Sequence, residues 1–170
     1  MAMKVLVAYG TKYGATAEIA ERIGQTMTQA GLEVDVTPAK RAGSPSEYQA
    51  VVLGSAVYMG QWRAEVANFL KDNEKLLSEQ PVWIFSSGPS GKGDPVELVQ
   101  GWRFPKGLAP VIERIKPRDI SIFHGNYDVK KMNFIQKWML NKARAPMGDF
   151  RDWAAITRWA GGIAAALKKG

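Results

Sequence analysis

The chain contains no cysteine and only one histidine, His124, among its 170 residues. Without thiols it cannot form disulfides, iron–sulfur clusters or cysteine-ligated zinc sites, and a single imidazole excludes a histidine-rich metal centre, so we predict no metal site. No apolar run is long enough to cross a bilayer, and the first residues lead straight into an apolar segment, which leaves no room for a signal peptide. We therefore expect a cytoplasmic protein, free or peripheral on the cytoplasmic face of a membrane.

Positive charge is in excess. The formal net charge is +7 and the isoelectric point is near 9.7. Such a balance favours anionic partners, whether nucleic acid, acidic lipid head groups or a polycarboxylate substrate, and does not choose among them. With 46% hydrophobic residues, the length fits a single domain over residues 1–170 with a sizeable core.

The first apolar run, Val5 to Tyr9, is typical of a strand buried in a parallel sheet, and an amphipathic helical pattern starts at Ala15. The connection between them offers the hydroxyls of Thr11 and Thr16, and a glycine, Gly14, that permits close backbone approach. A helix N-terminus binds anions through its free amides, so the connection predicts a phosphate site. Its spacing fits neither the dinucleotide fingerprint nor the P-loop, and an ordinary tight turn is the alternative.

The remaining pattern alternates strands and helices. Strands are expected over 32–37, 48–55 and 82–85, a fifth strand with its terminal turn over 119–127, and helices over 15–30, 63–77, 108–115 and 152–169, with an irregular segment over 93–107. This alternation predicts an α/β fold with a doubly wound, five-stranded parallel sheet.

Two further connections lie at the carboxyl ends of predicted strands, where open α/β sheets bind ligands. The connection 55–62 carries large apolar side chains that suit a flat ring system, although Tyr58 and Trp62 could instead cap the core. The connection after the next strand, Ser86-Ser87-Gly88, has small residues that bring backbone amides close to a ligand.

The connection 11–16 resembles the phosphate loop of the flavodoxins, whose pattern is Thr/Ser-x-Thr-Gly-x-Thr, with Tyr13 at the third position in place of Thr. That substitution, together with Gly54–Gly60 and Ser86–Gly88, is similar to the flavodoxin-like quinone-dependent protoporphyrinogen IX dehydrogenases. The resemblance covers essentially the whole chain. It implies the sheet order 2-1-3-4-5 and a non-covalently bound flavin mononucleotide (FMN).

The resemblance also implies which residues bind the cofactor: Thr11, Lys12, Tyr13, Gly14, Ala15 and Thr16 around the phosphate, and Val57, Tyr58, Met59, Gly60, Ser86, Ser87 and Gly88 around the ring. It implies that electrons pass from protoporphyrinogen, an anionic substrate of heme biosynthesis, to a quinone. No residue stands out as catalytic, because a flavin carries the redox chemistry itself.

A basic insert over about 128–148 follows the fifth predicted strand. From Lys130 to Gly148 it has five basic residues and no acidic one. As a helix it would place Lys130, Lys137, Asn141 and Arg144 on one face, and Met132, Phe134, Ile135, Trp138 and Met139 around the other. We expect it to face a substrate or, through Lys130–Arg144, an anionic membrane; the alternative is that Phe134, Trp138 and Met139 pack on the sheet.

Three functions follow from these patterns. The first is an FMN-dependent oxidoreductase that passes electrons from protoporphyrinogen IX or a similar anionic substrate to a quinone. The second is an electron-carrier flavodoxin that shuttles electrons between protein partners, although such carriers tend to be acidic and need no insert. The third, nucleic-acid binding, has no motif to accompany the charge, so no nucleic-acid partner is expected. The sequence does not indicate an oligomeric state.

Overall fold

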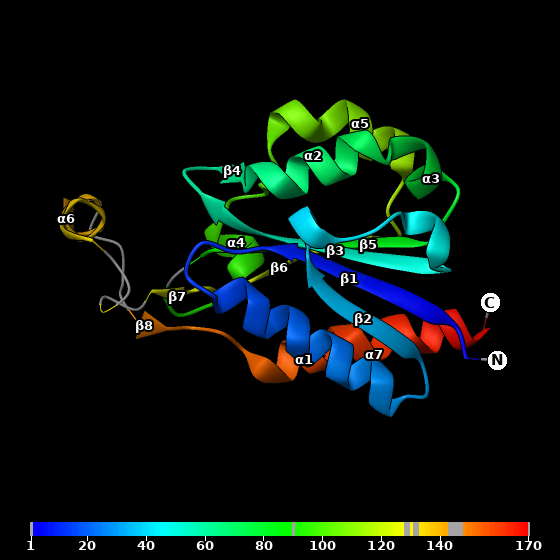
Figure 1. The fold of residues 1–170 in the computed structure, drawn as a ribbon. Coiled ribbons are helices and arrows are strands. Elements are labelled where there is room, and N and C mark those ends of the chain that lie inside the picture. The colour runs from blue at the N-terminus through cyan, green and yellow to red at the C-terminus, as the bar shows by residue number, and fades with distance from the viewer. Residues whose placement is uncertain (1, 90, 128–129, 131–132, 143–147, 170) are drawn as a thin grey trace.

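The structure is a computed structural model that describes residues 2–89, 91–127, 130, 133–142 and 148–169. Its centre is a parallel sheet of order β2-β1-β3-β5-β6 (Figure 1). The strands are β1 (Lys4–Gly10), β2 (Glu33–Pro38), β3 (Ala50–Tyr58), β5 (Val82–Ser87) and β6 (Asp119–Phe123). The predicted fold class and strand order are therefore confirmed.

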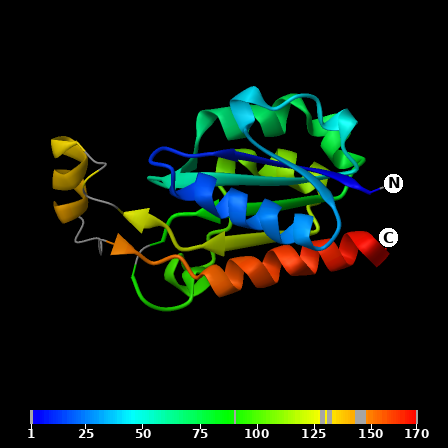
Figure 2. The same ribbon diagram turned by 60° about the horizontal axis from the view of Figure 1, so that its bottom comes forward.

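Helices cover both faces of the sheet (Figures 1 and 2). On one face lie α1 (Ala15–Gln29) and α7 (Trp153–Lys169), and on the other α2 (Ala64–Asp72), α3 (Glu74–Ser78) and α5 (Ala109–Ile115). Successive strand residues point to opposite faces, so Val5 and Val7 pack toward α1 and α7 while Leu6 and Ala8 pack toward α2 and α5. Burial on both faces explains why β1 reads as a continuous apolar run.

Three local predictions need correction. The helix expected over 63–77 is divided into α2 and α3 at Asn73, whose side-chain amide donates a hydrogen bond to the carbonyl of Phe69, 2.9 Å away, and so competes with the helical pattern. The segment 93–107 contains a short helix, α4 (Pro95–Leu98), capped by Asp94. The fifth strand ends at Phe123, and β7 (Asn126–Tyr127) instead pairs with β8 (Gly148–Asp149).

The insert forms one described helix, α6 (Phe134–Lys142), which projects beyond the carboxyl ends of the sheet strands, at the end of the molecule opposite both termini (Figure 1). Met132, the side chain of Met139, and Arg144 lie outside the residues that the structure describes. Among the described helices, none is both long enough and apolar enough to span a bilayer.

The close packing of α1 on β2 gives a stability prediction. A Cβ atom added at Gly24 of α1 would lie 2.4 Å from Cγ2 of Val36, whereas one added at Gly161 of α7 would meet nothing within 4 Å. We expect Gly24→Ala to destabilise the fold by about 1–3 kcal/mol through overpacking, even though alanine favours a helix. Gly161→Ala, the matched control, should be neutral or stabilise by up to about 1 kcal/mol. Urea unfolding measures both, and equal effects would contradict the packing argument.

Candidate functional site

The connection from β1 to α1 has the geometry of an anion site. Gly14 is the N-cap of α1 and adopts a left-handed conformation with φ 94°, which only glycine adopts without strain. Its amide donates to Oγ1 of Thr11 over 2.9 Å, and Thr16 in the first turn is 1% exposed. In the described part of the chain no side chain caps the start of α1, so its first amides are available to an anion.

The connection after β3 is a β-hairpin rather than the predicted loop. β3 continues to Tyr58 and pairs antiparallel with β4 (Gln61–Trp62) across Met59 and Gly60, whose φ angles of 52° and 76° form a two-residue hairpin turn. Trp62 is buried, and its Nε1 donates to Oγ of Ser86 over 2.9 Å, so Trp62 belongs to the core. Met59 at the tip is 76% exposed.

A cleft joins these connections, and we call it the loop cleft. It is lined by Thr11, Lys12, Tyr13, Ala15, Thr16, Ala56, Ser87, Gly88, Gly125, Asn126 and Tyr127. The sequence analysis did not single out the last three. A signal was nevertheless present, because Gly125-Asn126-Tyr127 follows the fifth strand, at the sheet edge where the other two connections end.

A second hollow, the apolar pocket, adjoins the loop cleft at Gly88, which lines both. It has a volume of about 310 Å³ and is lined by Val57, Gly60, Gly88, Pro89, Val99, Trp102 and Ile122. Its wall is mostly apolar, and two of its residues, Val57 and Gly60, come from the hairpin. Such a wall suits part of a flat ring. Val57 and Gly60 therefore lie where the sequence analysis expects ring contacts.

Aromatic side chains lie in and beside the loop cleft. Nζ of Lys12 lies 4.2 Å from the ring centroid of Tyr58, so this lysine links the connection between β1 and α1 to the β3–β4 hairpin. The hydroxyl of Tyr127 donates to the carbonyl of Gly88. Burial and then the neighbouring Tyr58 raise the pKa of Tyr127 above its ordinary value. Tyr58, Tyr127 and Lys12 are thus gathered at one end of the sheet.

Of the residues predicted to bind the cofactor, Ser86 has its side chain engaged in the core, because its buried hydroxyl accepts a hydrogen bond from Nε1 of Trp62. Ser87 and Gly88 line the loop cleft, and Met59 is exposed at the hairpin tip. The binding roles themselves remain predictions.

Three apolar side chains of the insert helix α6 are exposed. Phe134 is 82%, Ile135 66% and Trp138 55% exposed, so the alternative that Phe134 and Trp138 pack on the sheet is wrong. The helix starts with a reciprocal cap, in which the amide of Asn133 donates to Oε1 of Gln136 and the amide of Gln136 donates to Oδ1 of Asn133. Burial raises the pKa of Tyr13 above its ordinary value, and the nearby Gln136 side chain and the charge of Arg63 act in the opposite direction.

Arg151 fixes β8 to the start of α1. Its side chain is 5% exposed and lies 2.8 Å from Oδ2 of Asp149 and 3.3 Å from Oε2 of Glu18, and it donates to the carbonyl of Ala15 over 3.2 Å. The anchor joins residues more than 130 positions apart, so nothing in the local sequence indicated it. It holds the β7–β8 ribbon, which carries Tyr127, against the phosphate connection.

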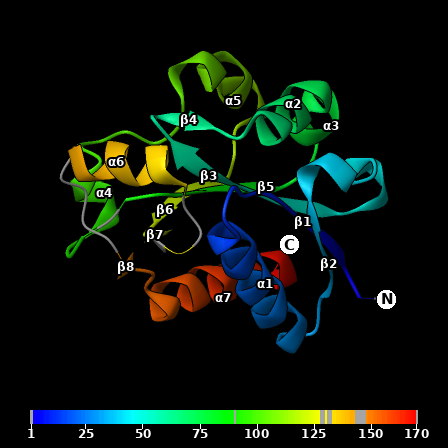
Figure 3. The ribbon, with the colours of Figure 1, turned by 60° about the vertical axis from the view of Figure 1, so that its left-hand side comes forward.

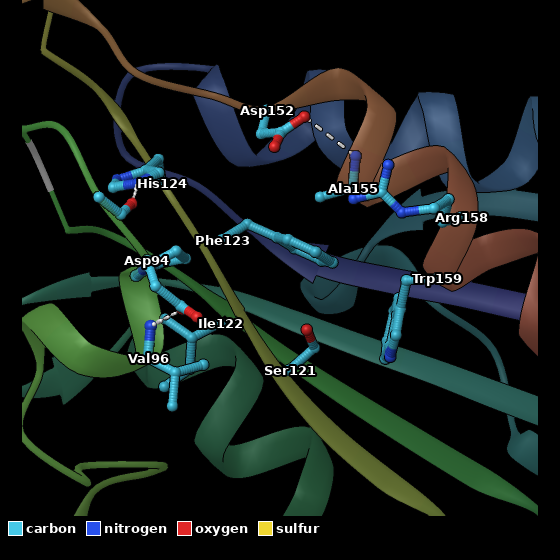
Figure 4. Close-up of a pocket in the computed structure, with 12 residues that line it drawn as sticks. Asp94, Val96, Ser121, Ile122, Phe123, His124, Asp152, Ala155, Arg158 and Trp159 are labelled. Carbon is cyan, nitrogen blue, oxygen red and sulfur yellow. Dashed lines mark hydrogen bonds between the residues drawn. The ribbon is translucent and has the colours of Figure 1, made fainter.

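A larger hollow lies elsewhere, against the edge strand β6, between α4 and α7 (Figure 4). Its volume is about 680 Å³, and the two carboxylates and the imidazole that line it already have partners. The carboxylate of Asp94 caps α4 and that of Asp152 caps α7. The two ring nitrogens of His124 lie 3.0 and 2.7 Å from the carbonyl oxygens of Pro89 and Gly93. We therefore assign His124 a structural role.

Comparisons with known proteins agree with this geometry. A family model described as a flavodoxin domain matches residues 6–152. The Escherichia coli (strain K12) protein named protoporphyrinogen IX dehydrogenase (quinone) is 28% identical over 86 residues, covering 49% of this chain and 48% of that protein. A Leishmania major protein of the same name is 24% identical over 178 residues, covering 95% and 75%. The match to the E. coli relative thus spans about half of its length.

Solved structures share the fold. An archaeal flavodoxin superposes with a TM-score of 0.64 at 17% identity, covering 98% of this chain and 99% of its own. The rubredoxin oxygen:oxidoreductase of Desulfovibrio gigas superposes with a TM-score of 0.65 at 18% identity, covering 98% and 36%.

The Arg151 anchor predicts a loss of stability in acid. The guanidinium holds the pKa of Asp149 below its ordinary value of 3.8. The charged carboxylate therefore stabilises the fold at neutral pH, and this contribution is lost as the pH falls below about 4 through the lowered pKa. Asp149→Asn should unfold at lower urea than the wild type at pH 7, and the two proteins should converge well below pH 4. The exposed Asp72→Asn is the control, and a gap for Asp149→Asn that is the same at both pH values would contradict the anchor.

Proposed function

The chain belongs to the flavodoxin domain family, and from this premise we propose that it is an oxidoreductase that binds FMN and passes electrons from protoporphyrinogen IX or a similar anionic substrate to a quinone. In each transfer the donor loses two electrons and two protons, and the quinone gains both to become a quinol. The observation that carries the proposal is the loop cleft, where the uncapped start of α1 meets the carboxyl ends of β3 and β5.

The residue types around the cleft suit FMN, and because the cleft itself has a volume of only about 50 Å³, the ring would extend into the adjoining apolar pocket of about 310 Å³. The left-handed Gly14 and the free first amides of α1 would hold the phosphate, assisted by the hydroxyls of Thr11 and Thr16. Tyr58 and the apolar pocket would contact the ring. The bound flavin supplies the redox chemistry, and the protein supplies position and charge.

The alternative is an electron carrier that serves protein partners. We favour the enzyme because the end of the molecule that holds the cleft is both basic and apolar. There Lys137 and Lys142 lie on α6 beside the exposed side chains of Phe134, Ile135 and Trp138. Chemically reduced protein mixed with a quinone distinguishes the two. An enzyme should return to the oxidised spectrum with a membrane quinone, and a carrier should do so only with a protein acceptor.

We expect the apoprotein to bind FMN more tightly than riboflavin, since the phosphate adds contacts to α1. Gly14→Val forces a β-branched residue into the left-handed region, which costs about 1–3 kcal/mol, and should weaken FMN binding by roughly tenfold or more. Gly31→Val is the matched control, because Gly31 also has a positive φ, 98°, but lies at the far end of α1. Calorimetry measures both. Equal affinity of the wild type for FMN and riboflavin would refute the phosphate site.

We also propose that the end of the molecule around the loop cleft docks on an anionic membrane, where quinones are found. The large hydrophobic side chains that the structure shows exposed are Met59, Val96, Leu98, Phe134, Ile135 and Trp138. They come from the β3–β4 hairpin, α4 and α6, which lie toward the same end of the molecule (Figure 3). Apolar burial combines there with attraction worth about 1 kcal/mol per Lys or Arg near anionic lipid.

Lys130→Glu combined with Lys137→Glu should abolish sedimentation with anionic vesicles at low salt and leave FMN content unchanged. Trp138→Ala should weaken binding at low and high salt alike, because it removes apolar area rather than charge. The control is Lys71→Glu with Lys75→Glu, on α2 and α3. If the wild type stays in the supernatant with anionic vesicles at low salt, the membrane role is wrong.

A further inference from the structure

Lys12 occupies a special place in the loop cleft. It is the only charged residue among those that line the cleft. Its ammonium lies 4.2 Å from the ring centroid of Tyr58 and 5.6 Å from that of Tyr13, so the side chain turns toward the hairpin. This lysine therefore brings a positive charge to the part of the site that would hold the flavin ring.

Two arginines near the cleft are paired. Arg151 is bound by Asp149 and Glu18, and Nε of Arg63 lies 3.6 Å from Oε1 of Glu65. Within the part of the chain that the structure describes, no carboxylate lies within 4 Å of Lys12. Its charge is therefore not cancelled by an adjacent anion, and Lys12 is itself exposed, so its charge acts on the cleft from the solvent side.

Charge at the ring distinguishes the two redox states. The oxidised flavin ring is neutral, whereas a ring that has gained two electrons and one proton carries a negative charge. A fixed cation nearby stabilises the reduced anion and not the neutral ring, for the same reason that a cation lowers the pKa of a neighbouring acid. The phosphate has the same charge in both states, so any bond from Lys12 to it cancels in the comparison.

We propose that Lys12 is a redox-tuning residue, which makes the reduced, anionic flavin bind more tightly than it otherwise would and so favours uptake of electrons in pairs from a substrate. The proposal rests on the proposed function, because it requires that FMN occupies the cleft. The proposal also favours the enzyme over the electron carrier. A site that stabilises the reduced anion accepts two electrons more readily, and it is a weaker electron donor at low potential.

The test compares the dissociation constants of oxidised and reduced FMN in four proteins: wild type, Lys12→Met, Lys12→Arg and Lys71→Met. In Lys12→Met, reduced FMN should lose roughly tenfold or more in affinity relative to oxidised FMN, which corresponds to a fall of about 30 mV in the two-electron midpoint potential. Lys12→Arg keeps the charge and should retain the wild-type ratio. Lys71→Met removes an exposed charge from α2 and should also leave the ratio unchanged.

Two results would overturn the proposal separately from the function. If Lys12→Met weakens both redox states equally, Lys12 is only a phosphate ligand. If neither affinity changes, its charge does not reach the ring. If the wild type binds no FMN at all, the proposed function fails first, and the role of Lys12 fails with it.

Discussion

The parallel pairing of β1, β3 and β5 is the constraint on which the site depends. The register aligns Gly10 with Ser55 and Ala56 with Ser87, so the three strands end at one edge and their connections meet there. The alignment also requires close packing: a Cβ atom added at Gly54 would lie 2.0 Å from the ring of Phe85. A glycine inside β3 therefore lets an aromatic side chain fill the core beside that strand, and the connections predicted to contact phosphate and ring are carried by one sheet.

The sheet was predictable because its signals are local. An apolar run followed by a helical pattern indicates a buried parallel strand, and Gly14 before α1 indicates the phosphate connection without reference to the rest of the chain. The hairpin was not predictable in the same way. Large apolar residues after Ser55 fit a ligand loop as well as a strand, and the left-handed Met59 is a conformation that its residue type does not signal.

Contacts between distant segments were the second feature that could not be predicted from the sequence. Strand β7 pairs with β8 across the whole insert, and Arg151 joins β8 to the first turn of α1. Neither contact produces a periodic hydrophobic pattern in the sequence, because each involves only two or three residues whose partners are set by the tertiary structure. Their effect on the site is nevertheless direct, because the β7–β8 ribbon carries Tyr127, whose hydroxyl bonds the carbonyl of Gly88 between the loop cleft and the apolar pocket.

The departure of Tyr13 from the flavodoxin pattern acquires a physical explanation from the insert. A threonine at this position would keep a short hydroxyl within the connection from β1 to α1, whereas the longer tyrosine side chain lies near Gln136, which also closes the cap of α6. The substitution and the insert are thus two parts of one contact. In this chain the proximity of Tyr13 and Gln136 places the start of α6 beside the connection from β1 to α1, so the exposed apolar side chains of α6 lie at the end of the molecule that holds the cleft.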